Sequence, residues 1–192
     1  DVHPLEIARQ LCLIESDLFS QIKPSRDLIN ISKEKTKTIN NCIDFSNRLS
    51  RWVAGEVVQT ANVKKRVAVL RCLIEIASHC WKLNNFSSSA AILFGLDHFA
   101  VQRLKVTWKS LSKKTSKVYD DLLSTISVQN NFEKLRAAIQ KAKPPMVPYL
   151  PIYLKDISLL ELGNPTIVEG TEDILNFSKF SMIAKHFQQI DK

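Results

Sequence analysis

PPMVPYLPIYLKDISLLELGNP, residues 144–165, is the segment that decides how this chain folds. Two prolines end one helix, and two more, Pro148 and Pro151, stiffen a short extended approach to the next, because proline fits the first helical turn but not a helix interior. Gly163-Asn164-Pro165 then forms a strong helix stop. The spacing predicts a helix from about Ile152 to Leu162.

A second periodic segment follows this helix. After Val168, apolar residues recur at helical spacing, namely Ile174, Phe177, Phe180, Ala184 and Phe187. Two helices joined by a short loop form a helical hairpin, which we expect over about residues 148–190, beside a helical core over residues 1–147. The first hairpin helix is too apolar for a solvated protrusion, so another part of the chain should cover it.

The rest of the chain also favours helices. Its 192 residues suit one domain, 45% of them are hydrophobic and only 4 are glycine. This profile predicts an all-α fold, an irregular multi-helix domain. The helix capped by Asn62 is apolar on both sides, so it should be central and buried nearly all round. Residues 24–38 read as a polar loop, and further helices are expected over residues 5–22, 41–60, 87–99, 101–108, 112–126 and 132–142.

Several classes of function are disfavoured by the sequence. No apolar run approaches the roughly 20 residues of a membrane span, and no Gly-rich phosphate loop, HExxH motif or Cys/His cluster with metal-ligand spacing occurs. We therefore expect no cofactor, no metal and no chemistry of its own. The start of the chain is neither an initiator methionine nor a signal peptide, so the chain reads as a piece of something larger. Four cysteines without a CxxC pair are expected to be buried free thiols of a reducing, cytoplasmic compartment: Cys12, Cys42, Cys72 and Cys80.

The net charge is +8, and basic residues concentrate in one acid-free stretch. They are Arg103, Lys105, Lys109, Lys113, Lys114 and Lys117. A solvated helix face explains such a stretch, and a surface for nucleic acid or an anionic membrane is the alternative. With no catalytic constellation in the chain, its function should come from a surface.

Six segments, taken in order, resemble the blocks of one family. They read HPLEIARQL (residues 3–11), NRLSRWV (47–53), RVAVL with LNNF (66–70 and 83–86), VQRLKVTW (101–108), PMVPYLPIYLKD (145–156) and ILNFSK (174–179). The chain resembles the catalytic domain of Ras-family guanine-nucleotide exchange factors, the RasGEF domain, and the blocks cover nearly all of it. The resemblance implies an all-helical fold with a protruding hairpin that acts as a lever.

The resemblance also implies a noncovalent activity. The partner would be a Ras-like small GTPase of the Ras or Rap subfamily, whose switch II segment the central helices grip while the first hairpin helix displaces switch I. GDP would then be released, because a surface that binds the nucleotide-free GTPase best must weaken nucleotide binding by the same factor. A cytoplasmic protein recruited to membranes is expected.

The residues matching the family's motifs are the candidate GTPase contacts. Tyr149 should pack against switch II, and Asn84 and Asn85 either hydrogen-bond switch II or only cap a turn. Arg66 either holds an internal ion pair or faces switch II. Tyr153 and Ile157 should face the hairpin's own support, whereas the GTPase contacts on the same helix are expected to be Leu154, Lys155, Ser158, Leu159 and Leu162.

Two departures from the family leave alternatives open. Leu162 stands where many Ras exchangers carry a glutamate, and a leucine there is similar to some Rap-directed exchangers. The chain also stops just after the second hairpin arm, where the family has further helices, so it reads as truncated at its C-terminus. A catalytically weak GTPase-binding scaffold with the same fold is one alternative. A basic helical nucleic-acid-binding domain is another.

Overall fold

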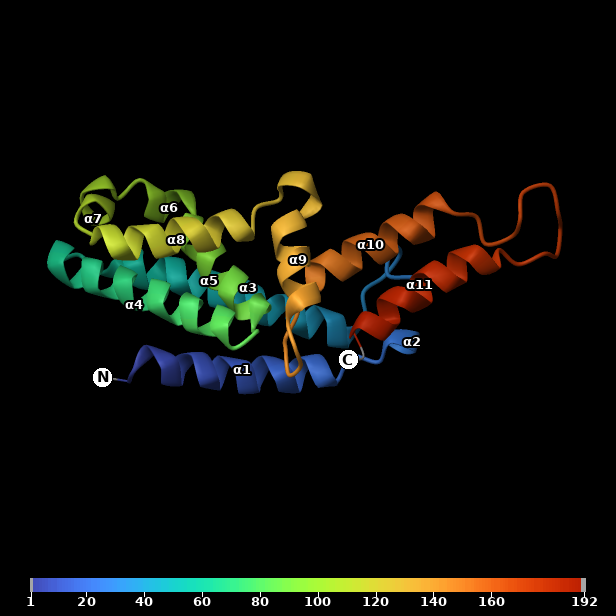
Figure 1. The fold of residues 1–192 in the computed structure, drawn as a ribbon, viewed down its shortest axis with the longest axis horizontal. Coiled ribbons are helices and arrows are strands. Elements are labelled where there is room, and N and C mark those ends of the chain that lie inside the picture. The colour runs from blue at the N-terminus through green and yellow to red at the C-terminus, as the bar shows by residue number, and fades with distance from the viewer. Residues whose placement is uncertain (1, 191–192) are drawn as a thin grey trace.

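The computed structural model describes residues 2–190, which form an all-α fold as predicted (Figure 1). The expected helix over residues 101–108 is interrupted at residues 103–104 and becomes two short helices, α6 and α7. A 3₁₀ turn, η1, spans Gln129–Asn131. The α-helices are α1 (Pro4–Ser20), α2 (Pro24–Asp27), α3 (Lys37–Gln59), α4 (Val63–Lys82), α5 (Phe86–Asp97), α6 (Phe99–Gln102), α7 (Lys105–Lys109), α8 (Lys113–Thr125), α9 (Glu133–Lys141), α10 (Leu150–Gly163) and α11 (Phe177–Ile190).

Helices α4 and α5 are both central to the main core, and α5 is the more fully buried of the two. Asn62 caps α4 as expected, its side chain accepting a hydrogen bond from the Lys65 amide at 3.1 Å, but α4 keeps an exposed row of charged residues. Helix α5 is buried along most of its length and packs against both α3 and α4. Its small residues permit this close approach: a Cβ on Gly95 would lie 2.5 Å from the Ser50 carbonyl oxygen of α3. The prediction that α4 is buried nearly all round is therefore wrong.

Helix α1 buries a carboxylate that apolar periodicity did not predict. The carboxylate is that of Glu15, which is 5% exposed, whereas its apolar neighbour Ile14 is 46% exposed. The Glu15 carboxylate accepts hydrogen bonds from the hydroxyls of Ser87 at 2.9 Å and Ser88 at 2.6 Å. Burial raises the pKa of Glu15. The hydroxyls of α5 thus provide the polar partners that a buried acid requires.

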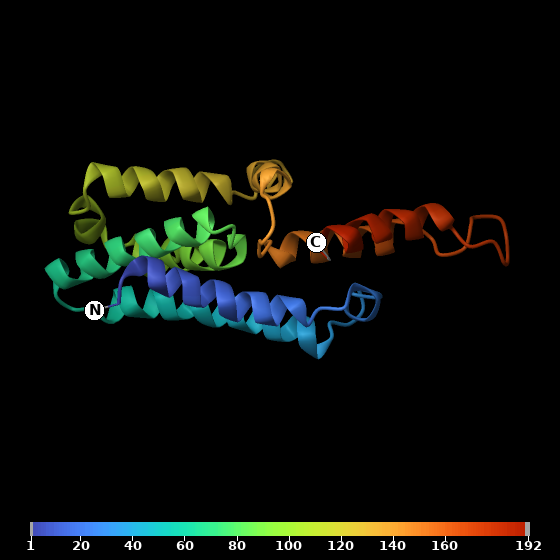
Figure 2. The same cartoon turned by 60° about the horizontal axis from the view of Figure 1, so that its bottom comes forward.

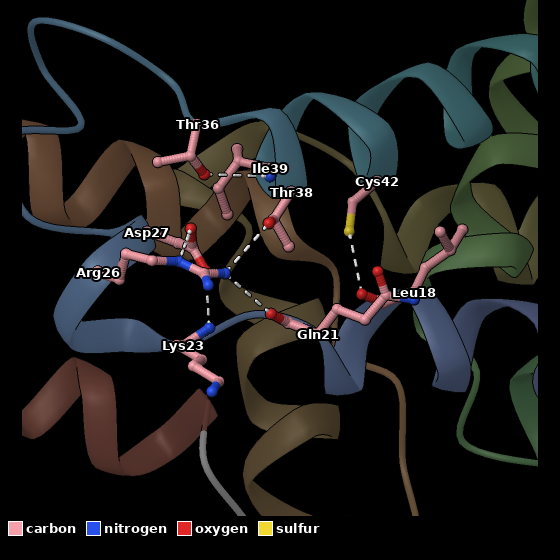
Figure 3. A network of polar contacts seen from close by, with 9 residues as sticks. All are labelled: Leu18, Gln21, Lys23, Arg26, Asp27, Thr36, Thr38, Ile39 and Cys42. Atoms are coloured by element: carbon pink, nitrogen blue, oxygen red, sulfur yellow. Dashed lines mark hydrogen bonds and ion pairs between the residues drawn. The ribbon is translucent and has the colours of Figure 1, made fainter.

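Residues 24–38 are more ordered than the expected polar loop. They begin with α2, and a polar network around it folds the segment back on itself (Figure 3). Asp27 is fully buried and accepts hydrogen bonds from Arg26 at 2.7 and 2.9 Å and from the Lys23 amide at 2.8 Å. The Arg26 guanidinium is the main cause that lowers the pKa of Asp27 to about 2. This fold buries Leu28 and Ile31 beneath the hairpin.

The hairpin of α10 and α11 extends from one end of the helical core in both views (Figures 1 and 2). Helix α10 begins two residues before the predicted start, and residues 164–176 form a longer connection than the expected short loop. The expectation that α10 is covered is confirmed, because its apolar face packs in a second cluster, separate from the main core. The buried members of this cluster are Ile22, Leu28, Ile31, Ile39, Leu150, Tyr153, Leu154, Ile157, Ile183 and Ile190.

The cysteines and the helix lengths bear on two further expectations. All four cysteines are free thiols, but only Cys80 is fully buried, so the expectation of burial is wrong for the other three. Burial raises the pKa of the half-buried Cys42 to about 11.

None of the helices within residues 2–190 has the length and apolar character needed to cross a bilayer.

Candidate functional site

The segment that leads into the hairpin is fixed to the turn between α4 and α5. The Val147 amide donates to the Asn84 carbonyl at 3.0 Å, and the Phe86 amide donates to the Val147 carbonyl at 2.9 Å. The Asn84 side chain donates to the Lys143 carbonyl at 3.0 Å. Asn84 has a φ of 58°, a left-handed conformation that asparagine tolerates better than most residues. The hairpin therefore starts from a fixed point on the core.

Asn85 has a structural role in this turn. Its carboxamide oxygen accepts from the Ser88 amide at 2.9 Å, which caps α5, and its amide nitrogen donates to the Ser88 hydroxyl at 3.1 Å. The residue is 0% exposed. Of the two roles expected for Asn85, the structure favours the cap, because its polar side-chain atoms are bonded inside the protein and are not free to bind switch II.

Tyr149 is the last residue before α10 and lies between two aromatic rings. Its ring centroid is 6.1 Å from that of Phe94 and 6.0 Å from that of Phe132. Burial raises the pKa of its hydroxyl, although the residue keeps some exposed surface. Tyr149 thus couples the start of α10 to the main core and keeps part of its surface exposed.

Helix α10 has one buried and one exposed face. Tyr153 and Ile157 are buried against the second apolar cluster, as predicted. Leu154 lies on that buried face as well, at 7% exposure, so the expectation that it points outward is wrong. The reason is geometric. Residues 28–31 pack against α10 in addition to α11, so a larger part of the helix surface is buried than α11 alone would cover.

The exposed face of α10 carries four of the predicted contacts. Leu159 is 57% exposed and Leu162 is 75% exposed. Lys155 is exposed and Ser158 partly so, and the spacing of three and four residues places all of them on one side of the helix. This row, residues 155, 158, 159 and 162, is here called the outer row. It presents two large apolar side chains that nothing in residues 2–190 buries.

Polar contacts set the angle of α10. Arg136 of α9 donates to both carboxylate oxygens of Asp156, at 2.6 and 2.8 Å. On the next turns, the Glu161 carboxylate accepts from the amides of Asn30 at 2.6 Å and Ser32 at 2.9 Å. These contacts fix the helix on two sides at once, so the outer row is presented on a rigid element.

The second arm is tied to the first by a buried lysine. Lys179 of α11 is 7% exposed, and its ammonium donates to the Glu161 carbonyl at 3.1 Å and to the Thr166 hydroxyl at 3.2 Å. Asn176 begins α11, accepting from the Lys179 amide at 3.2 Å and donating to the Pro165 carbonyl at 3.0 Å. The Glu161 carbonyl at the end of α10 and the Pro165 carbonyl just after it thereby gain donors.

A comparison with known protein families identifies the family to which this chain belongs. The model of the RasGEF domain matches residues 6–181, nearly the whole chain. The chain belongs to the RasGEF domain family. The resemblance seen in its sequence blocks is thereby confirmed, and the protruding hairpin agrees with it.

Relatives of this RasGEF domain are much longer proteins. Ras guanine nucleotide exchange factor M of Dictyostelium discoideum is 37% identical over 99% of this chain and 21% of that protein. Ras guanine nucleotide exchange factor Q of the same organism is 36% identical over 100% of the chain and 15% of that protein. Rap guanine nucleotide exchange factor 6 of Homo sapiens is 35% identical over 97% of the chain and 12% of that protein. The chain thus spans about a fifth or less of their length.

The RasGEF domain brings most of the candidate contacts to one region, with one exception. The outer row, Tyr149 and Asn84 lie on the hairpin or at its base. Arg66 lies in the first turn of α4, about 25 Å along the helix axis from Asn84. Its guanidinium donates to the Thr107 hydroxyl at 2.8 Å and to the Thr60 carbonyl at 3.1 Å. Arg66 therefore ties α4 to α7, through internal hydrogen bonds and not the expected ion pair.

Sequence analysis missed the residues that hold the RasGEF hairpin in place. In the sequence, Arg136, Glu161 and Lys179 look like ordinary charged surface residues between the apolar positions of their helices. A signal existed for Lys179 alone, because it sits in the ILNFSK block that resembles the family. For the other two, the partner lies on a distant segment that only the fold identifies.

Proposed function

We propose that this chain promotes the release of GDP from a Ras-like small GTPase. Membership of the RasGEF domain family supports the proposal, and so do the names of the relatives, which are Ras and Rap exchange factors. The single observation that carries it is the outer row: two exposed leucines on a helix whose other face is buried. Large apolar anchors on a rigid element are typical of protein partner sites.

The outer row would act by stabilising the opened form of the GTPase. Leu159 and Leu162 would insert beside the nucleotide site and displace switch I, while Tyr149 and Asn84 contact switch II at the hairpin base. Each tenfold acceleration of release needs about 1.4 kcal/mol of preference for the opened state. Lys155 is the only charged member of the outer row, and its ammonium donates to the Asn131 side chain at 2.9 Å. The proposed mechanism is noncovalent and requires no reacting group from the chain.

Leu162 bears on which GTPase is used. Because a leucine carries no charge, Leu162 would act through steric intrusion. A leucine at this position is similar to some Rap-directed exchangers, so we propose Rap in preference to Ras. The relatives do not discriminate, since Ras exchangers and a Rap exchanger match the chain at 35–37% identity. We also propose that the protein works in the cytoplasm and is recruited to membranes.

The second candidate function is a scaffold that binds a Ras-like GTPase without accelerating release. Leu162 favours it, because the outer row contains no acid that would disturb the phosphate and magnesium environment of the nucleotide. A scaffold and an exchanger share the same contacts. They differ in whether the nucleotide-free GTPase is bound more tightly than the GDP form.

The experiment is the release of a fluorescent GDP analogue from purified Ras, Rap and Ral proteins with the 192-residue chain added. Faster release from one member would support exchange and identify the substrate. Binding without acceleration would favour the scaffold, and no binding would overturn both. Leu159→Ala should abolish most of the acceleration. Leu13→Ala is the matched control, because Leu13 is similarly exposed, at 64%, on α1.

A further inference from the structure

Positive charge is strongly segregated in this chain. Residues 57–74 and 98–119 contain ten lysines and arginines and no aspartate or glutamate. Because the whole chain has a net charge of only +8, all remaining residues together sum to −2. The basic character of the protein therefore resides in these two segments and does not extend over the surface as a whole.

The fold brings the two acid-free segments together. Helix α4 packs against α7 and α8, and the Arg66–Thr107 hydrogen bond of 2.8 Å joins the first turn of α4 to α7. In Figure 1 the start of α4, α7 and the start of α8 lie at one end of the elongated molecule, and the hairpin lies at the other. We call this region, residues 63–65 and 99–117, the basic end.

The charges of the basic end are free for a partner. Eight of its side chains are exposed, and within residues 2–190 none of them lies within ion-pair distance of a carboxylate. The eight are Lys64, Lys65, Arg103, Lys105, Lys109, Lys113, Lys114 and Lys117. A surface of this kind attracts polyanions, and no carboxylate of the described residues pairs with these lysines and arginines to offset the attraction.

Apolar side chains project from the same region. Phe99 on α6 is 72% exposed, Val106 on α7 is 65% exposed and Val63 at the start of α4 is 37% exposed. Exposed aromatic and aliphatic residues beside lysines are the composition of surfaces that enter the headgroup region of a bilayer. A nucleic-acid surface needs the charge but has no use for exposed valines, since bases are held by stacking on aromatic rings.

We propose that the basic end docks on an anionic phospholipid bilayer, with Phe99 and Val106 entering the headgroup layer. Each lysine near such a surface contributes about a fivefold gain in binding, and the contribution is screened by salt. Because the basic end and the hairpin lie at opposite ends of the molecule, docking leaves the outer row accessible. The inference does not depend on exchange activity, and it gives the expected membrane recruitment a physical site.

The test measures co-sedimentation of the 192-residue chain with vesicles of phosphatidylcholine alone and of phosphatidylcholine mixed with phosphatidylserine. Binding is expected only to the mixed vesicles and should weaken as NaCl rises from about 0.1 M to about 0.5 M. K105E/K109E should weaken vesicle binding at least about 25-fold, because each of the two lysines contributes about fivefold. K113E/K114E should do the same and is safe for folding, because acids are favourable in the first turn of α8. F99S/V106S should weaken it at least about tenfold through lost apolar burial.

The matched control is K33E/K35E, which changes net charge equally at two exposed lysines outside the basic end. It should lose much less binding than K105E/K109E. Equal losses in both variants would overturn the proposed site, and so would absence of binding to the mixed vesicles. Tighter binding to a single-stranded RNA, lost in K105E/K109E, would also overturn it and identify a nucleic-acid surface. GDP release in solution, measured without vesicles, should be the same in K105E/K109E and wild type, so failure of either proposal leaves the other standing.

Discussion

Arg136 and Asp156 form a two-pronged ion pair that joins α9 to α10, with N–O distances of 2.6 and 2.8 Å. Their side chains are 28% and 14% exposed, so the pair is partly shielded from water. Asp156 lies one residue from Lys155 and two from Ser158, which belong to the outer row. The pair therefore sets the direction in which the candidate GTPase contacts point.

Arg136→Ala should reduce exchange more than its effect on stability would suggest. Losing two hydrogen bonds between charged groups costs about 2 kcal/mol of folding free energy, and the released α10 would no longer hold its angle. A lever that must be ordered on binding loses affinity for the opened GTPase. The measurements are GDP release, thermal denaturation and amide hydrogen exchange of α10.

Arg71→Ala is the matched control for this prediction. Arg71 pairs with Glu75 at 4.0 Å, with side chains 60% and 50% exposed, so its loss should change stability by less than about 0.5 kcal/mol. If Arg136→Ala left hydrogen exchange in α10 unchanged, the proposed role of the ion pair in fixing the hairpin would be wrong.

Leu154 and Leu159 should respond oppositely to truncation. Leu154→Ala removes a buried side chain from the cluster under the hairpin and should destabilise the domain by about 2–5 kcal/mol. Leu159→Ala should leave the melting temperature nearly unchanged and lower GDP release, because Leu159 is 57% exposed. Denaturant unfolding and release assays on both variants separate the two roles. A stable Leu154→Ala variant with normal melting would contradict the assignment of Leu154 to the buried face.

The sequence was sufficient where the signal is local. Proline and glycine positions located α10 nearly to the residue, because the backbone restrictions they impose do not depend on tertiary contacts. The central position of α5 could not be predicted in the same way. In the sequence, Ser87 and Ser88 look like surface residues. They are buried in the fold, where their hydroxyls donate hydrogen bonds to Glu15 of α1, which is far away in the sequence.

The candidate site shows the same division. Leu159 and Leu162, which the family resemblance suggested as GTPase contacts, are both exposed on one face of α10, and their contact with a GTPase stays a prediction. Leu154 was assigned to the wrong face, since the width of the covered arc depends on how α11 and residues 28–31 pack. The sequence left two roles open for Asn85, a contact with switch II or a cap, and the structure decides for the cap because the Asn85 carboxamide is bonded to Ser88.

Gly95→Ala should destabilise the domain. A Cβ at this position would lie 2.5 Å from the Ser50 carbonyl oxygen and 2.9 Å from Val53, so α3 and α5 would have to separate, at a cost of about 1–3 kcal/mol. Gly55→Ala is the internal control with the opposite sign. Its Cβ would meet only the Gln59 side chain at 3.8 Å, and alanine gains about 1 kcal/mol over glycine inside a helix. Urea denaturation of both variants gives the comparison, and equal signs would contradict the close approach of α5.

Tyr149→Ala should lower GDP release and also cost stability. The ring packs against Phe94 and Phe132, so its removal should cost about 3–5 kcal/mol of folding free energy. Tyr149→Phe keeps those contacts and should restore stability. If Tyr149→Phe also restores full release, the ring supplies the partner contact; a loss of release in a stable Phe variant would assign the contact to the hydroxyl. Thermal denaturation and the release assay together distinguish these outcomes.

Asp27 should give the domain a stability that depends on acidity. Hydrogen bonds from Arg26 are the main reason that the folded pKa falls from 3.8 to about 2. A lowered folded pKa means that the unfolded chain binds the proton more tightly, so the stabilisation is present above about pH 4 and is lost as pH falls through about 2. Asp27→Asn should therefore destabilise the domain at neutral pH and make progressively less difference toward pH 2. Urea unfolding across this pH range measures the difference in unfolding free energy between wild type and Asp27→Asn. Asp44→Asn, which changes an exposed carboxylate, is the control. If this difference in unfolding free energy stayed constant with pH, Asp27 would stabilise the domain through packing and not through its charge.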